Sequence, residues 1–233
     1  MPRGTFQQEL DRLVEEVVEL GREVESCLGT MVEALETHDV EIARRVFGVD
    51  ASYKERGAQI AEECLILQAR QAPVARDLRL IYTVQTVQNH LVRAGTLCEH
   101  ICQAVAESAD AERDPDLEAA LLEMCRGACS LFRQGVDIFE ARDIDRARDL
   151  EAADDKVDLL YSEAMNLAVN PGKDGGSSSP EWRVWAALTV HYLERIADHG
   201  VSLGERTVFL VTGERMESAI RQYRDQQLDQ YDD

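Results

Sequence analysis

The stretch HYLERIADHGVSLGERTVFLVTG, residues 191–213, decides the fold of this chain. At about 100° per residue, its apolar side chains fall on one stripe of a helix and its acidic side chains fall on the opposite side. The acidic row holds Glu194, Asp198 and Glu205, with His191 beside it. A helix of this kind predicts a bundle with a core on one face and a row of carboxylate oxygens on the other. The apolar stripe comprises Leu193, Ile196, Gly200, Leu203 and Leu210.

The composition of the whole chain favours helices. Apolar residues make up 45% of the 233 residues, and 5 prolines and 14 glycines interrupt them. Long segments rich in Ala, Leu, Glu, Arg and Val are typical of helices, and no alternating strand pattern is present. The sequence therefore predicts an all-α fold.

Periodicity and turn residues predict six long helices, with Asp39, Asp114 and Asp143 as expected N-caps and Gly213 as an expected C-cap. A polar run at 108–116 and a Gly/Ser-rich run at 171–180 interrupt the helical patterns. We expect two tandem three-helix bundles, residues 1–109 and 110–213, followed by a polar tail at 214–233. The helices are expected at residues 5–36, 39–71, 73–107, 115–142, 143–169 and 181–212.

An internal repeat supports two similar halves. The segment ALETHDVEIARRV at 34–46 aligns with IFEARDIDRARDL at 138–150. The identical pairs are Glu36/Glu140, Asp39/Asp143, Ala43/Ala147 and Arg44/Arg148. A repeat of this period predicts two copies of one supersecondary unit.

The charge of the chain limits its partners. A formal net charge of −20 repels phosphate backbones, so we expect no binding to nucleic acid. The same surface suits cations or partners with basic patches. No apolar run reaches the roughly 18 residues that span a bilayer, so no integral membrane protein is expected.

Six cysteines lie inside the helical patterns, and the first ten residues, MPRGTFQQEL, have no apolar run of a signal peptide. We therefore expect reduced thiols and a cytoplasmic protein. Two pairs with a spacing of four could form a zinc site, but the usual Cys-x-x-Cys spacing is absent, which favours buried thiols. The cysteines are Cys27, Cys64, Cys98, Cys102, Cys125 and Cys129.

Four carboxylates form the candidate metal site. Glu194 and Asp198 are four residues apart, and so are Asp154 and Asp158 in the preceding helix. If these helices pack antiparallel, the four side chains could converge, and such oxygen clusters bind Mg, Mn or Fe. They point away from the apolar stripe, so a metal would lie at the bundle surface. The alternative interpretation is a solvated acidic face.

Two stretches resemble the PhoU family of phosphate-uptake regulators. LERIADHGVSLGERTVFLVTGE at 193–214 resembles the last helix of that family, which carries a Glu/Asp-x-x-x-Asp motif. QAPVARDLRLI at 71–81 resembles its turn into the third helix, with Pro73, Asp77 and Arg79 in place.

The resemblance implies a cytoplasmic regulator, often a homodimer, that damps phosphate-starvation signalling and is not an enzyme. It implies two partners, the ATPase subunit of the phosphate ABC transporter and a membrane histidine kinase. It also implies that Fe or Zn can bind the acidic motifs. We expect Asp77, Arg79 and Arg195 to contact partners, although Arg195 could instead hold a neighbouring acid and Asp77 could serve the helix dipole.

The first half has lost most of the acidic positions. Val92 takes the place of Glu194, Thr96 that of Asp198 and Lys54 that of Asp158, whereas Asp50 keeps the place of Asp154. The sequence therefore predicts an asymmetric protein with a candidate cation site in the second half only. We expect Lys54 to pair with a neighbouring acid.

Two other functions stay open at the sequence level. One is a carboxylate-bridged metal-dependent enzyme, although the chain has no Glu-x-x-His pair, HExxH motif or Gly-Lys-Ser/Thr loop. The other is a helical scaffold of different lineage. The leading hypothesis is a regulator that acts by protein–protein interaction.

Overall fold

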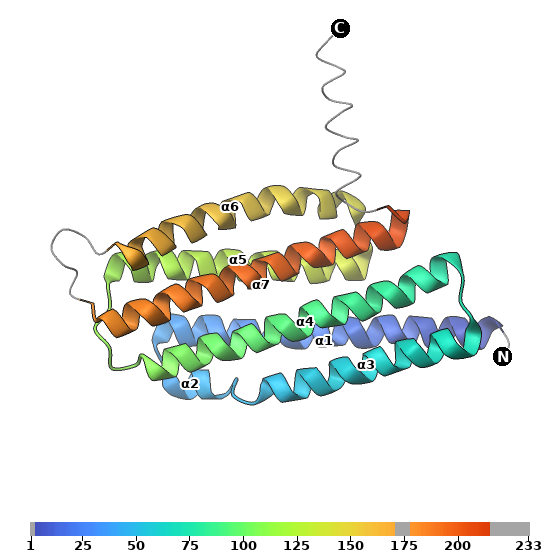
Figure 1. Cartoon of the computed structure of the whole chain (residues 1–233), viewed down its shortest axis with the longest axis horizontal. Coiled ribbons are helices and arrows are strands. Elements are labelled where there is room, and N and C mark those ends of the chain that lie inside the picture. Colours follow the sequence, from blue (N-terminus) through green and yellow to red (C-terminus); the bar gives the residue numbers. More distant parts are fainter. Residues whose placement is uncertain (1–2, 171–177, 215–233) are drawn as a thin grey trace, which may run out of the picture.

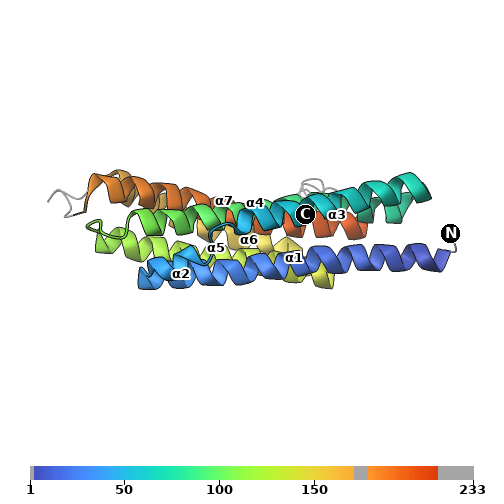
Figure 2. The same cartoon turned by 90° about the horizontal axis from the view of Figure 1, so that it is seen from below.

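The computed structural model describes residues 3–170 and 178–214, and within these ranges it contains seven α-helices and no strand. The long helices run side by side, and α6 and α3 lie at opposite edges of an elongated, flat molecule (Figures 1 and 2). The expected loop at 171–180 and the polar tail lie largely outside the described residues. The helices are α1 (Arg3–Thr37), α2 (Val40–Arg44), α3 (Val49–Gln71), α4 (Ala75–Glu107), α5 (Pro115–Ala141), α6 (Ile144–Val169) and α7 (Pro180–Thr212).

The helices form two bundles, which confirms the predicted all-α fold. Helices α1, α3 and α4 pack against one another, and so do α5, α6 and α7. The apolar stripes face inward and form one continuous core, in which the largest fully buried side chains come from both bundles. No helix in the described part of the chain is long and apolar enough to cross a membrane. These buried side chains include Leu13, Leu20, Met31, Leu91, Ile101, Leu117, Met124 and Phe132.

The expected helix at 39–71 is wrong in one respect, because the structure divides it into α2 and α3. Gly48 between them has a φ of 85°, a left-handed conformation that glycine adopts without steric cost. The short α2 buries Ile42 and Ala43 against α1 and α4, and Val46 is also buried. The break allows the chain to bury this turn before α3 continues along the bundle.

The cap residues are mostly where the sequence predicts them. The Asp39, Asp114 and Asp143 side chains accept hydrogen bonds from backbone N–H groups at the starts of α2, α5 and α6. Gly213 ends α7 in the left-handed conformation. Helix α4 begins at Ala75 rather than Pro73, because the extended Val74 is its N-cap.

An antiparallel seam between α4 and α7 joins the two bundles (Figure 1). Along this seam, the ring centroids of Tyr82 and Phe209 lie 5.9 Å apart. Farther along, those of His100 and Tyr192 lie 5.5 Å apart. The last helices of the two bundles therefore pack directly on each other over much of their length.

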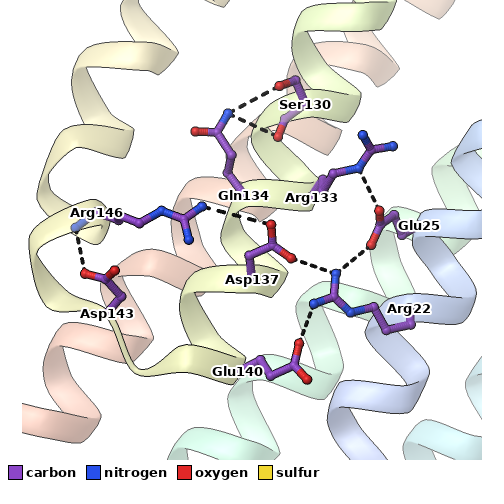
Figure 3. Close-up of polar contacts among 9 residues, drawn as sticks. All are labelled: Arg22, Glu25, Ser130, Arg133, Gln134, Asp137, Glu140, Asp143 and Arg146. Carbon is purple, nitrogen blue, oxygen red and sulfur yellow. Dashed lines mark hydrogen bonds and ion pairs between the residues drawn. The ribbon is translucent and has the colours of Figure 1, made fainter.

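A network of ion pairs joins α1 to α5 in the layer of the molecule that does not contain α4 and α7 (Figures 2 and 3). The Arg22 guanidinium lies 2.7 Å from an oxygen of Asp137, 2.9 Å from one of Glu25 and in contact with Glu140. The Nε of Arg133 also reaches Glu25, at 2.6 Å. An isolated surface pair is worth less than about 1 kcal/mol, but a shared guanidinium fixes the register of two helices.

Within the second bundle, α5 and α7 approach closely at Gly135 and Gly200. A Cβ built on Gly135 would lie 2.3 Å from the carbonyl oxygen of Gly200, and one built on Gly200 would lie 2.7 Å from the backbone nitrogen of Phe132. Only glycines allow these two backbones to touch. This contact sets the position of α7, the helix that carries the acidic row.

We predict that Gly200→Ala lowers the free energy of unfolding by about 1–3 kcal/mol, because backbone atoms cannot move away from the new methyl group as a side chain could. Urea denaturation measures the effect. Gly29→Ala is the matched control: its Cβ would meet nothing within 4 Å, so the gain in helix propensity should stabilise the protein by about 0.5–1 kcal/mol. Equal effects of the two substitutions would contradict the close packing.

Candidate functional site

The four predicted carboxylates lie on α6 and α7, which pack together. Asp154 and Glu194 are half-buried, whereas Asp158 and Asp198 are exposed. They lie at the surface of the bundle, as the position of the acidic row opposite the apolar stripe predicts. The Nδ1 atom of His191 is 3.8 Å from a carboxylate oxygen of Glu194.

The electrostatics indicate that these carboxylates act on one another. Burial, followed by the negative charges of Asp158, Asp198, Asp155 and Glu194, raises the pKa of Asp154 to about 6. Burial and the charge of Asp158 raise the pKa of Asp198. Burial and the charge of Asp198 also raise the pKa of Glu194, although His191 opposes this shift. The structure therefore brings the acids of the two helices into one negatively charged face.

The donor set of this acidic face fits a hard cation, because it consists of carboxylate oxygens that repel one another. Within residues 3–170 and 178–214, however, no three His, Cys, Asp or Glu side chains are arranged as the ligands of one metal ion. The metal-binding role of Asp154, Asp158, Glu194 and Asp198 therefore stays a prediction.

The equivalent place in the first bundle holds a neutralised set of side chains. The Nζ atom of Lys54 lies 2.6 Å from a carboxylate oxygen of Asp50, which confirms the expected pairing of Lys54 with an acid. The hydroxyl of Thr96 donates a hydrogen bond to the other carboxylate oxygen of Asp50. A carboxylate of Glu99, which the sequence comparison did not single out, accepts a hydrogen bond from the Asp50 backbone N–H at 3.0 Å.

Asp50 and Asp154 occupy equivalent positions, yet their pKa values shift in opposite directions. Burial alone would raise the pKa of Asp50, but the hydrogen bonds from Lys54 and Thr96 hold it below its usual value. For Asp154, burial and then the charges of its acidic neighbours raise the pKa to about 6. The first bundle carries Lys54, Thr96 and Val92 where the second carries Asp158, Asp198 and Glu194, and these three differences change the charge of the whole face.

The three predicted partner residues lie on α4 and α7 at separate places rather than gathered. Asp77 lies in the first turn of α4, where the helix dipole favours a negative charge. The Arg79 guanidinium lies against the end of α7, since a Cβ on Gly213 would be 2.6 Å from its terminal nitrogen. Arg195 lies on α7 beside the acidic face, and its charge counteracts the raised pKa values of Glu194 and Asp198.

The sequence did not predict a histidine pair in the same seam. The Nδ1 atoms of His90 on α4 and His199 on α7 lie 3.3 Å apart. Burial and the positive charges of His90, Arg195 and Arg93 lower the pKa of His199 to about 4. No signal within either helix reveals this pair, because it depends on the register between the two bundles.

The raised pKa of Asp154 predicts a pH dependence of stability. As the pH falls from 7 to 5, native Asp154 takes up a proton while the unfolded carboxyl, with a pKa of about 3.9, stays ionised. This group therefore adds stability as the pH falls, and it opposes folding above pH 6. Asp154→Asn should stabilise the protein at pH 7, by about 1 kcal/mol after solvent screening, and this gain should shrink toward pH 5. Urea denaturation at several pH values measures it.

Glu151→Gln, on the exposed side of the same helix, is the matched control and should show no such trend.

Asp158→Lys copies the arrangement of Lys54 and Asp50 into the second bundle, and should move the pKa of Asp154 below its usual value in an NMR titration. A titration of Asp154 that stays near pH 6 in this variant would show that its acidic neighbours do not control it.

Comparison with known proteins identifies the fold and its relatives. The PhoU domain matches the chain twice, over residues 17–105 and 121–207. The crystal structure of the phosphate transport system regulatory protein PhoU from Streptococcus pneumoniae superposes with a TM-score of 0.82 at 24% identity, and covers 91% of this chain and 99% of that one. PhoU from Pseudomonas aeruginosa has a TM-score of 0.83, also at 24% identity, with 90% of this chain and all of the other covered. Both structures share the fold of two three-helix bundles.

Sequence relatives cover nearly the whole chain. The phosphate-specific transport system accessory protein PhoU homolog of Clostridium acetobutylicum is 28% identical over 218 residues, which are 93% of this chain and 99% of the relative. The accessory protein PhoU of Escherichia coli is 26% identical over 211 residues, 91% of this chain and 87% of its own length. These relatives are accessory and regulatory proteins of phosphate transport. With both of its bundles matched by the PhoU domain, the chain belongs to the PhoU family.

Proposed function

We propose that this protein regulates phosphate uptake and phosphate-starvation signalling from the cytoplasm, by binding the phosphate ABC transporter through its ATPase subunit and by binding a membrane histidine kinase. The observation that carries this proposal is the match of the PhoU domain to both bundles, together with relatives that are transport accessory proteins over nearly their full length. We also propose that the protein acts as a homodimer and not as an enzyme.

The physical properties of the chain suit a regulator that acts by binding. A protein that binds one conformational state of its partner more tightly than another shifts the partner toward that state, without any chemistry of its own. The net charge of −20 favours encounter with basic surfaces on the transporter or the kinase. The flat, elongated shape offers such partners a long face (Figure 2).

The α4–α7 seam is our candidate for the contact face. Arg79 and Arg195 both lie along it, and no ion pair holds either of them in the described ranges, unlike the ion-paired Arg22 and Arg44. An arginine that no short ion pair holds can turn its guanidinium toward a partner's acceptor, although Arg195 also lies near Glu194 and Asp198. Asp77 at the start of α4 extends this face toward the α3–α4 turn.

We predict that the full chain binds the purified ATPase subunit of the phosphate transporter from the same organism. The affinity should fall about tenfold or more between 50 and 500 mM salt, because ionic screening weakens contacts between an acidic and a basic surface. Biolayer interferometry measures both values. Arg195→Gln should weaken binding several-fold, whereas Arg44→Gln, at an exposed and ion-paired site, should not. Absence of binding to the ATPase subunit and to the kinase would overturn the proposed function.

We further propose that the acidic face of Asp154, Asp158, Glu194 and Asp198 binds a divalent cation such as Fe, Zn, Mn or Mg. These residues would hold the ion at the bundle surface, and the ion would relieve the repulsion that raises the pKa of Asp154. The cation would supply a bridge to partner carboxylates or phosphates rather than a reaction centre.

We predict that Mn²⁺ binds at pH 7 and more weakly at pH 5, since protonated carboxyl groups must release their protons to become ligands. Isothermal titration calorimetry measures the affinity and, in buffers of different ionisation enthalpy, the released protons. The double variant Glu194→Gln/Asp198→Asn should lose the binding, and Asp50→Asn in the first bundle should retain it. Equal loss in both variants would show that Mn²⁺ binds the acidic surface without preference for the second bundle.

A further inference from the structure

The core of the first bundle contains two thiols in direct contact. Cys27 on α1 and Cys98 on α4 are 71 residues apart in sequence, and their Sγ atoms lie 3.3 Å apart. The sulfur atoms of a disulfide lie about 2.05 Å apart, so the two sulfurs must approach each other by only about 1.2 Å more to form a bond. We infer that Cys27 and Cys98 are a redox modification site, which a peroxide converts into a disulfide that joins α1 to α4.

The two thiols differ in a way that assigns their roles. Cys27 keeps 8% of its surface exposed, whereas Cys98 is fully buried. The hydrogen bond from Cys98, and a smaller contribution from Tyr53, lower the pKa of Cys27 despite its burial. Burial raises the pKa of Cys98 well above its usual value. Cys27 is therefore the thiol that meets the oxidant, because the thiolate is the reactive form.

The oxidation proceeds in two balanced steps. The Cys27 thiolate attacks one oxygen of hydrogen peroxide, the O–O bond breaks, and the departing hydroxide leaves as water with the thiol proton. The sulfur of Cys98 then attacks the sulfur of the resulting Cys27 sulfenic acid, and the S–O bond breaks as a second water leaves. Two thiols lose two electrons and two protons, and one peroxide gains them to form two waters.

Thiol hydrogen bonds also join Cys98 to Cys102 and Cys125 to Cys129, but each of these pairs lies four residues apart on one helix. Cys102 lies one helical turn from Cys98, where Cβ atoms are about 5–6 Å apart, whereas a disulfide needs about 3.8 Å. Cys125 and Cys129 have the same relation on α5. Cys64 is buried, with its sulfur 3.7 Å from the carbonyl oxygen of Ile81. Cys129 is the most exposed of the six and serves as an internal measure of how far the oxidant has acted.

Peptide mapping of the intact, folded protein tests the site. The chain is treated with increasing hydrogen peroxide, the remaining thiols are blocked with N-ethylmaleimide, and the protein is digested with trypsin. Cleavage after arginine places Cys27 in the peptide 23–44 and Cys129 in the peptide 127–133. The peptide 94–113 carries both Cys98 and Cys102, so the variant Cys102→Ala separates these two.

We expect a cross-link between 23–44 and 94–113 in the wild-type protein and in Cys102→Ala, and its loss in Cys98→Ala and in Cys27→Ala. The cross-link should form at peroxide concentrations that leave most of Cys129 unmodified, and should raise the melting temperature by several degrees until a reductant is added. Circular dichroism shows that each variant is folded, and Cys102→Ala controls for the loss of a buried thiol.

Three results would overturn this site. One is the absence of the cross-link at peroxide concentrations that fully oxidise Cys129. Another is a cross-link that persists in Cys98→Ala, which would assign the bond to Cys102. The third is a cross-link that forms only in urea, which would make it a product of the unfolded chain.

Discussion

The packing of α4 on α7 is the contact on which the rest of the structure depends. Each three-helix bundle would leave an apolar face of its last helix open to water, and the antiparallel seam buries both faces at once. The seam also decides which helices lie outside, because α3 and α6 are left at the edges (Figure 1). The acidic face of α6 and α7 is therefore a surface feature, and the two histidines of the seam are partly buried.

The two bundles show how three substitutions change the electrostatics of a repeated site. Asp50 and Asp154 occupy the same place in the same fold, and both are partly removed from water. With lysine four residues later, the carboxylate is neutralised and its pKa falls. With aspartate at that position, burial and the negative charges of the neighbouring acids together raise the pKa of Asp154 to about 6. Two sites of different electrostatic character therefore coexist in one chain.

Much of the fold was predictable from local features. The caps at Asp114, Asp143 and Gly213 and the long apolar stripes predicted the helices, because capping and amphipathicity act within a few residues. The break at Gly48 was missed, since a single glycine in a helical pattern gives no indication of whether the chain will turn there. The acidic face and the Lys54–Asp50 pair followed from the repeat. Contacts between distant helices, such as His90 with His199 and Cys27 with Cys98, depend on register that a single helix does not encode.

The pairing of Lys54 with Asp50 also determines how far the charge state of each bundle depends on the surrounding solution. A cation that is tethered by a side chain is present at a fixed and high effective concentration, so neither dilution nor a chelator removes it. Asp154, by contrast, is surrounded by acids and has no lysine of this kind among its described ion pairs. Its charge therefore varies with the pH and with the ions that the solvent supplies. One half of the molecule therefore keeps a constant electrostatic state, while its structural twin follows the ionic composition of its surroundings.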